Sequence, residues 1–107
     1  MSTAPKAEIL NLAEMVNYQP GSVVSRQITK SDTGNITLFA FDEGQGLSEH
    51  TTPFDALVHV LEGSAEIIIS GKSNHLKMGD AIIMPAGEPH ALQADGPFKM
   101  LLTMIRK

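Results

Sequence analysis

Two histidines that follow turn-forming residues are the clearest candidates for chemistry in this chain. His90 comes shortly after the Pro85-x-Gly87 turn, and His50 follows the glycine-rich segment 44–46. Proline restricts φ and glycine permits positive φ, so such turns hold the residue that follows in one orientation. An oriented imidazole suits a metal ligand or a catalytic base. Spacing alone, however, does not place the two imidazoles together.

Short apolar segments separated by turn residues predict an all-β chain around these histidines. Turn residues recur roughly every ten residues, which is typical of a sandwich or barrel. We predict a short helical turn within residues 8–16, with Asn11 as its N-cap, and a turn at 71–74. The predicted strands are 22–29, 36–41, 56–61, 65–70, 81–84, 91–94 and 98–105.

The residues before His90 resemble the second sequence motif of the cupin family of small β-barrels. In that motif Gly, Pro, Gly, His and Asn recur at fixed spacing. This chain has Gly79, Pro85, Gly87 and His90 at the first four positions and Ala94 at the last.

The residues around His50 resemble the first cupin motif, which carries two His, one Glu and two flanking Gly. Gly44, His50 and Gly63 stand at matching positions, whereas Thr52 replaces the second His and Ala56 replaces the Glu. The chain is therefore identified as similar to small single-domain cupins of the conserved-barrel (cupin 2) type, with a degenerate first motif.

The resemblance implies a single antiparallel β-barrel, a double-stranded β-helix of jelly-roll type, in one domain over residues 1–107. We expect an N-terminal arm at residues 1–21 and the barrel at 22–105. Small cupins commonly pair, so we also expect a homodimer, and the open apolar strand 22–29 suits pairing across a two-fold axis.

The resemblance also places His50 and His90 together inside the barrel, because the matching cupin positions point inward. There they are candidate ligands for a divalent transition metal: Fe, Mn, Ni, Zn or Cu. Two imidazoles leave most of the coordination sphere to water, so such a metal would be weakly held. Each imidazole could instead be a polar residue of the barrel interior or mouth that needs a hydrogen-bond partner.

Further candidates for a ligand pocket are Thr52, Ala56, His59, Met84 and Met100. On one extended strand His50, Thr52 and Ala56 would point to the same side, and His59 to the other. A bulge at Pro53 would turn His59 inward, where it could replace a missing ligand. Met84 and Met100 are expected nearest the imidazoles.

Two further residues and one strand complete the expectations for the interior. Asp55 either orients His50 or caps the turn after Pro53. His75 follows a turn and is expected to be solvated. In the last strand, Phe98, Met100, Leu102 and Met104 share one face, which we expect to point inward.

Composition excludes several other functions for this chain of 107 residues. Its net charge is −4, without a basic patch that could neutralise phosphates, so no nucleic-acid partner is expected. It has no Cys, which excludes disulfides and thiolate metal sites. No apolar segment approaches the length of a signal peptide core or a membrane span, so we expect no membrane partner and a cytoplasmic protein.

Two functions remain open. In the first, a cupin that has lost its catalytic centre binds a small molecule in the barrel cavity, with at most a weak two-histidine metal site. In the second, a metal-dependent enzyme of dioxygenase or isomerase type acts on a small organic substrate. The absent His and Glu favour the first.

Overall fold

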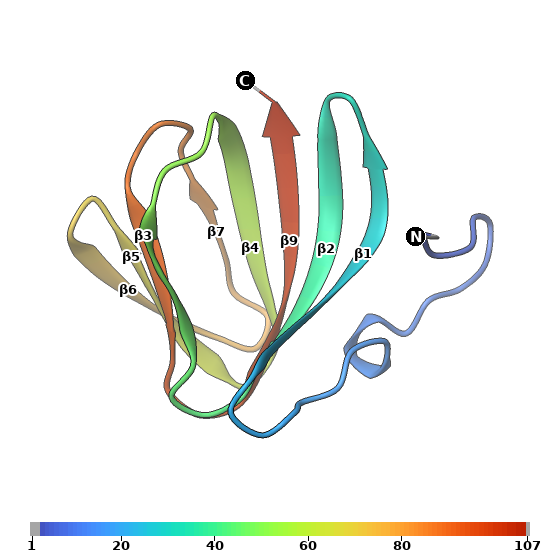
Figure 1. Ribbon diagram of the computed structural model, residues 1–107, viewed down its shortest axis with the longest axis horizontal. Helices are drawn as coiled ribbons and strands as arrows, with labels where there is room; N and C mark the ends of the chain where they lie inside the picture. The colour runs from blue at the N-terminus through green and yellow to red at the C-terminus, as the bar shows by residue number, and fades with distance from the viewer. Residues whose placement is uncertain (1–2, 107) are drawn as a thin grey trace.

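Alternating apolar side chains fold this chain into two antiparallel sheets that face each other. The structure is a computed structural model, and it describes residues 3–106. Its strands are β1 (Val23–Ser31), β2 (Gly34–Phe41), β3 (Gly46–His50), β4 (Phe54–Glu62), β5 (Ser64–Ile69), β6 (Lys72–Lys77), β7 (Ala81–Met84), β8 (His90–Ala94) and β9 (Phe98–Arg106). The larger sheet has the order β1-β2-β9-β4-β7, and the smaller sheet has the order β3-β8-β5-β6. The two sheets meet at one end of the molecule and diverge at the other (Figure 1).

The all-β jelly-roll-like architecture agrees with the sequence, but the expectation of one closed barrel is wrong. Within residues 3–106, β1 and β7 are the edges of the larger sheet, and β3 and β6 are the edges of the smaller one. The chain changes sheet between β4 and β5 at Gly63, whose φ is +77°. A Cβ at Gly63 would lie 2.3 Å from the carbonyl oxygen of Pro97, so only glycine fits this corner. Sharp corners of this kind separate the ladders instead of continuing them.

Two polar strands escaped prediction. The turn predicted at 71–74 is formed instead by Ser70 and Gly71, because β6 already begins at Lys72. Only Leu76 is buried in β6. Strand β3 likewise exposes its last three residues, 48–50. Both strands are sheet edges with little apolar alternation, which is the signal that strand prediction relies on.

The core lies between the sheets and contains the face of β9 that was expected to point inward. Phe98 and Met100 are fully buried there, and Leu102 and Met104 pack against the same cluster. From β4, Ala56, Val58 and Val60 are almost completely buried in that cluster. No helix within the described residues is long and apolar enough to cross a membrane.

The segment before β1 covers part of the outer face of the larger sheet, and it runs beside β1 in Figure 1. It contains a short 3₁₀ helix, η1 (Leu12–Glu14), inside the predicted range. Asn11 occupies the N-cap position, although its side chain makes no capping hydrogen bond. The segment and the outer face of the sheet form a second apolar cluster, apart from the core between the sheets. Its buried residues are Ala4, Val16, Ile28, Leu38 and Ala40.

The N-terminal segment also occupies part of the outer edge of β1. The Ala4 N–H donates a hydrogen bond to the Ile28 carbonyl at 2.8 Å. An edge strand that was expected to pair with a second copy is therefore partly satisfied within the chain. The homodimer stays a prediction, and light scattering over a range of concentrations would test it.

One buried ammonium group fastens the N-terminal segment to the sheet. Lys99 is 8% exposed, and its Nζ donates a hydrogen bond to the Ala13 carbonyl. The same Nζ lies 3.7 Å from the Glu62 carboxylate and 5.1 Å from the centre of the Tyr18 ring. The Tyr18 hydroxyl donates to Glu62 at 3.2 Å. Burial, followed by the charge and the hydrogen bond of Glu62, raises the pKa of Tyr18 to about 12.

Replacing this ammonium with an apolar group tests its importance. We expect Lys99→Met to lower the free energy of unfolding by about 1–3 kcal/mol, because Ala13 and Glu62 lose their charged partner. Urea unfolding followed by circular dichroism measures the change. Lys72→Met, at an exposed position on β6, is the matched control and should be nearly neutral. Equal effects of the two substitutions would contradict the role of Lys99.

Candidate functional site

A cavity of about 160 Å³ opens between the sheets, and both candidate histidines line it. His50 is exposed at its mouth, whereas His90 is only 3% exposed. Strand β3 ends and β8 begins at the end where the sheets diverge in Figure 1. The other lining residues are Phe39, Leu47, Thr52, Ala56, Met84, Leu92, Met100, Leu102 and Met104. The cavity is therefore mostly apolar, with two imidazoles at one side.

The two imidazoles face each other through their Nε2 atoms. These atoms are 3.2 Å apart, and the ring planes are inclined at 71°. Each Nδ1 lies near a backbone carbonyl: Ser48 at 2.7 Å from His50, and Glu88 at 3.3 Å from His90. A carbonyl only accepts, so both Nδ1 atoms carry hydrogen and donate. In the neutral pair, both Nε2 lone pairs therefore point toward a common place.

Two facing lone pairs need a proton, a hydrogen-bond donor or a metal ion between them. Burial, followed by the charge of His50, lowers the pKa of His90 below its ordinary value of 6.5, against the opposing effect of the Glu88 carbonyl. His90 therefore presents a neutral acceptor at neutral pH. At metal–nitrogen distances of about 2.0–2.1 Å, two ligands at angles between square and tetrahedral are about 2.9–3.4 Å apart.

The observed separation of 3.2 Å fits two neighbouring ligands of one metal ion. Within residues 3–106, however, no group of three or more His, Cys, Asp and Glu side chains converges. His50 and His90 would hold the ion, and other donors would have to complete its coordination. A metal so placed would supply a Lewis acid at the mouth of the cavity.

The loop between β7 and β8 aims His90 into the cavity. Gly87 adopts a φ of +81°, and its N–H donates to the Thr52 carbonyl at 2.8 Å. The neighbouring Ala86 N–H donates to Asp55 Oδ1 at 2.8 Å. From the sequence, Asp55 was expected either to orient His50 or to cap the turn after Pro53. It does neither. It anchors the loop that precedes His90.

The hairpin between β5 and β6 supports the same loop from the other side. The Ser70 N–H donates to the Pro89 carbonyl at 2.8 Å, and its hydroxyl donates to Glu88 Oε1 at 2.9 Å. Ser70 holds a φ of +49°, which is uncommon for a residue with a side chain. Sequence patterns gave no indication of this role, because Ser70 lies outside both motifs.

The connection between β3 and β4 brings His50, Thr52 and Ala56 to one cavity, although not along one strand. Strand β3 ends at His50, directly opposite His90, after an irregularity in register between Leu47 and His50. Thr52 lies between the strands, and its hydroxyl donates to the Phe54 carbonyl and accepts from the Phe54 N–H. The single extended strand assumed from their parity is therefore wrong.

The family model of the cupin domain, Cupin_2, matches residues 37–105, which include both imidazoles and every strand from β3 to β8. This chain belongs to the cupin family.

Solved structures and a curated protein are similar to it. A conserved protein of unknown function from Streptococcus pyogenes is 36% identical, with a TM-score of 0.91, over 100% of this chain and 96% of the other. A cupin superfamily protein from Desulfitobacterium hafniense is 30% identical, with a TM-score of 0.91, over 99% and 97% of the two chains. An uncharacterized protein from Aquifex aeolicus is 29% identical, over 95% of this chain and 85% of its own length.

His59 lies outside the cavity of this cupin. On β4, His59 pairs with Ala81 of β7 and with Leu101 of β9. Its side chain lies on the face opposite to Ala56 and Val58. The register of β4 with β9 is regular from Phe54 to Val60, so no bulge turns His59 inward. The prediction that His59 belongs to the ligand pocket is therefore wrong. His75 is exposed on β6 and lies 3.8 Å from Asp95.

Met84 and Met100 line the cavity together with a methionine that the pocket prediction omitted. Met84 and Met104 flank Ala56 on its two sides, in β7 and β9 respectively. Met104 shares the inward face of β9 with Met100, so parity had placed it in the interior without assigning it to the pocket. The register of three strands, which the sequence does not specify, brings Met84 and Met104 beside Ala56.

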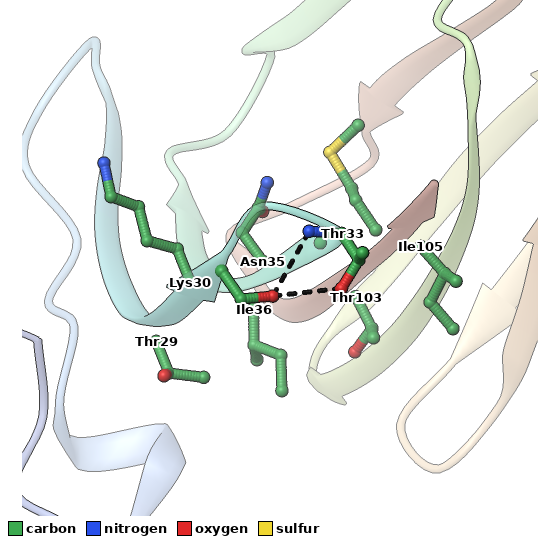
Figure 2. A pocket seen from close by; sticks show the side chains of 10 residues that line it. Thr29, Lys30, Thr33, Asn35, Ile36, Thr103 and Ile105 are labelled. Atoms are coloured by element: carbon green, nitrogen blue, oxygen red, sulfur yellow. Dashed lines mark hydrogen bonds between the residues drawn. The ribbon is translucent and has the colours of Figure 1, made fainter. Parts of the chain in front are cut away.

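A second hollow, of about 270 Å³, lies at the end of the β1–β2 hairpin (Figure 2). Its polar atoms partly satisfy one another: the Ser31 and Thr33 hydroxyls are 3.1 Å apart, and the Thr33 N–H donates to Ser31 at 3.3 Å. Lys30 extends away from Thr103 in this view. The hollow is open and has no converging pair of titratable groups, so the cavity with the two imidazoles is the stronger candidate.

The lowered pKa of His90 predicts how stability depends on pH in the metal-free cupin. Below pH 6.5 the unfolded His90 binds a proton more readily than the folded one, so the free energy of unfolding falls as pH decreases toward the lowered folded pKa. We expect this loss to be smaller in His90→Gln. Urea unfolding with a chelator, at about pH 5.5 and about pH 7.5, measures the difference. Identical pH dependence in the two proteins would contradict it.

Proposed function

We propose that this cupin binds a small, mostly apolar organic molecule in the cavity between its sheets, with the two imidazoles at the polar end. The facing Nε2 atoms of His50 and His90 carry the proposal, because they are two acceptors directed at one place. A hydroxyl or acid group of the ligand supplies the missing proton. In its absence, a metal ion is held there weakly.

The size of the cavity supports a ligand of one small ring. A cavity of about 150 Å³ with apolar walls accommodates benzene in a well-studied engineered protein. The cavity here has a similar volume, about 160 Å³. Its apolar walls favour transfer of such a ring from water, and its polar groups are confined to one side.

Phenol and toluene are matched probes for the proposed ligand class, since the hydroxyl group of phenol takes the place of the methyl group of toluene. We expect phenol to bind more tightly, by about tenfold, because it donates to an imidazole Nε2. Changes in methionine methyl NMR signals report binding in the cavity. In His90→Gln the preference should shrink while toluene binding persists. Equal binding of both probes, or binding of neither, would remove the ligand proposal.

The metal site has a separate test. We expect Co²⁺ to bind weakly to the native protein, and we expect His50→Ala and His90→Ala each to abolish that binding, since one imidazole is too little to hold the ion. His75→Ala removes an exposed histidine and is the control. The absorption spectrum of Co²⁺ and titration calorimetry measure occupancy. Binding that survives both substitutions would show that the ion lies elsewhere.

A metal-dependent enzyme is the second candidate. It is favoured because a metal ion on the two imidazoles would be a Lewis acid beside a mostly apolar cavity of a size for a small organic substrate. The double variant Thr52→His/Ala56→Glu tests whether these positions can complete a metal centre. We expect a gain of several powers of ten in Co²⁺ affinity, since two donors are added facing the same cavity. Without metal the variant should be less stable than the parent, because the buried Glu must ionise or stay unpaired. Unchanged affinity would remove the enzyme candidate.

The absence of a nucleic-acid partner and the cytoplasmic location stay predictions from composition.

A further inference from the structure

The cavity contains more metal donors than its two imidazoles. Among its lining residues, the remaining side-chain donors are the Thr52 hydroxyl and the thioethers of three methionines, Met84, Met100 and Met104. The Thr52 hydroxyl already donates to and accepts from the backbone of Phe54. The thioethers are therefore the donors left to complete a metal site.

Strand register gathers two of these thioethers beside one small residue. Ala56 on β4 is directly paired with Met84 on β7 and with Met104 on β9. Directly paired residues point to the same face, with Cβ atoms about 4.5–5.5 Å apart. Since Ala56 has only a methyl group, the two flexible methionine side chains can occupy the volume above it. His50 and His90 line the same cavity.

The chemistry of this donor set distinguishes between metal ions. No carboxylate lines the cavity, so imidazole nitrogen and thioether sulfur are neutral donors in mostly apolar surroundings. An ion with two positive charges would be poorly compensated there, whereas a single positive charge costs less desolvation. Thioethers are soft ligands, which suit Cu(I). Zinc and iron–sulfur clusters, which soft ligands also bind, are held mainly by Cys thiolates, and this chain has no Cys.

We propose that the cavity of this protein is a Cu(I) site in which His50, His90 and the thioether of Met84 or Met104 bind the ion. The inference rests on the two-imidazole site proposed above and assigns its metal. The two Nε2 atoms supply one side of the ion, and a thioether replaces water on the other. Divalent ions, which gain little from thioethers, bind the same imidazoles more weakly.

The test compares Cu(I) with Co²⁺ in the parent protein and in Met84→Leu/Met104→Leu. Leucine keeps much of the volume and removes both sulfur atoms. Cu(I) affinity is measured without oxygen, by competition with a chromogenic Cu(I) chelator. We expect the double variant to lose about tenfold or more in Cu(I) affinity, with Co²⁺ affinity unchanged. X-ray absorption of the Cu(I) protein should show sulfur as well as nitrogen scatterers, and the variant nitrogen alone.

A matched control and the histidine variants separate the outcomes. Met78 is 67% exposed, so Met78→Leu should leave Cu(I) affinity unchanged. If Cu(I) binding is lost in His50→Ala and His90→Ala but not in the double methionine variant, thioether ligation is overturned and the two-imidazole site stands. If none of these substitutions affects Cu(I) binding, the ion lies outside the cavity, and both thioether ligation and the two-imidazole metal site fail. A thermal unfolding curve for each variant checks that loss of affinity is not loss of fold.

Discussion

The alternation of β4 is the constraint on which the interior of this protein depends. Ala56, Val58 and Val60 must be buried between the sheets, so the intervening side chains face outward. This parity sends His59 away from the cavity. It also gives Asp55 its outward position, from which it anchors the loop before His90. Because β4 pairs with both β7 and β9, it sets which residues of those strands reach the cavity.

Backbone carbonyls, rather than acidic side chains, determine the state of the two imidazoles. Each Nδ1 donates to a carbonyl two residues earlier in the chain, Ser48 for His50 and Glu88 for His90. Such local bonds depend on the shape of the β3 irregularity and of the Pro85-x-Gly87 loop. The turn residues therefore act on the chemistry directly: they select the tautomer that leaves Nε2 free.

The sequence predicted the parts of this structure that have a strong local signal. Apolar alternation located β4 and β9, and the Pro-x-Gly turn located His90. Strand β6 was missed because a polar edge strand needs to bury only Leu76. The role of Asp55 and the gathering of Met84 and Met104 beside Ala56 were also missed. Both depend on long-range register, and parity along one segment carries no information about it.

The Lys99 anchor has a practical consequence for handling this protein. The N-terminal segment acts as a lid on apolar surface: Ile28, Leu38 and Ala40 are buried beneath or beside it. Farther along the same sheet, Ile83 and Ile105 are already 60% and 61% exposed. Trimming the chain to the first residue of β1 would add further exposed apolar area to this sheet, which favours aggregation. Fusion partners should therefore extend the N-terminus and never replace it.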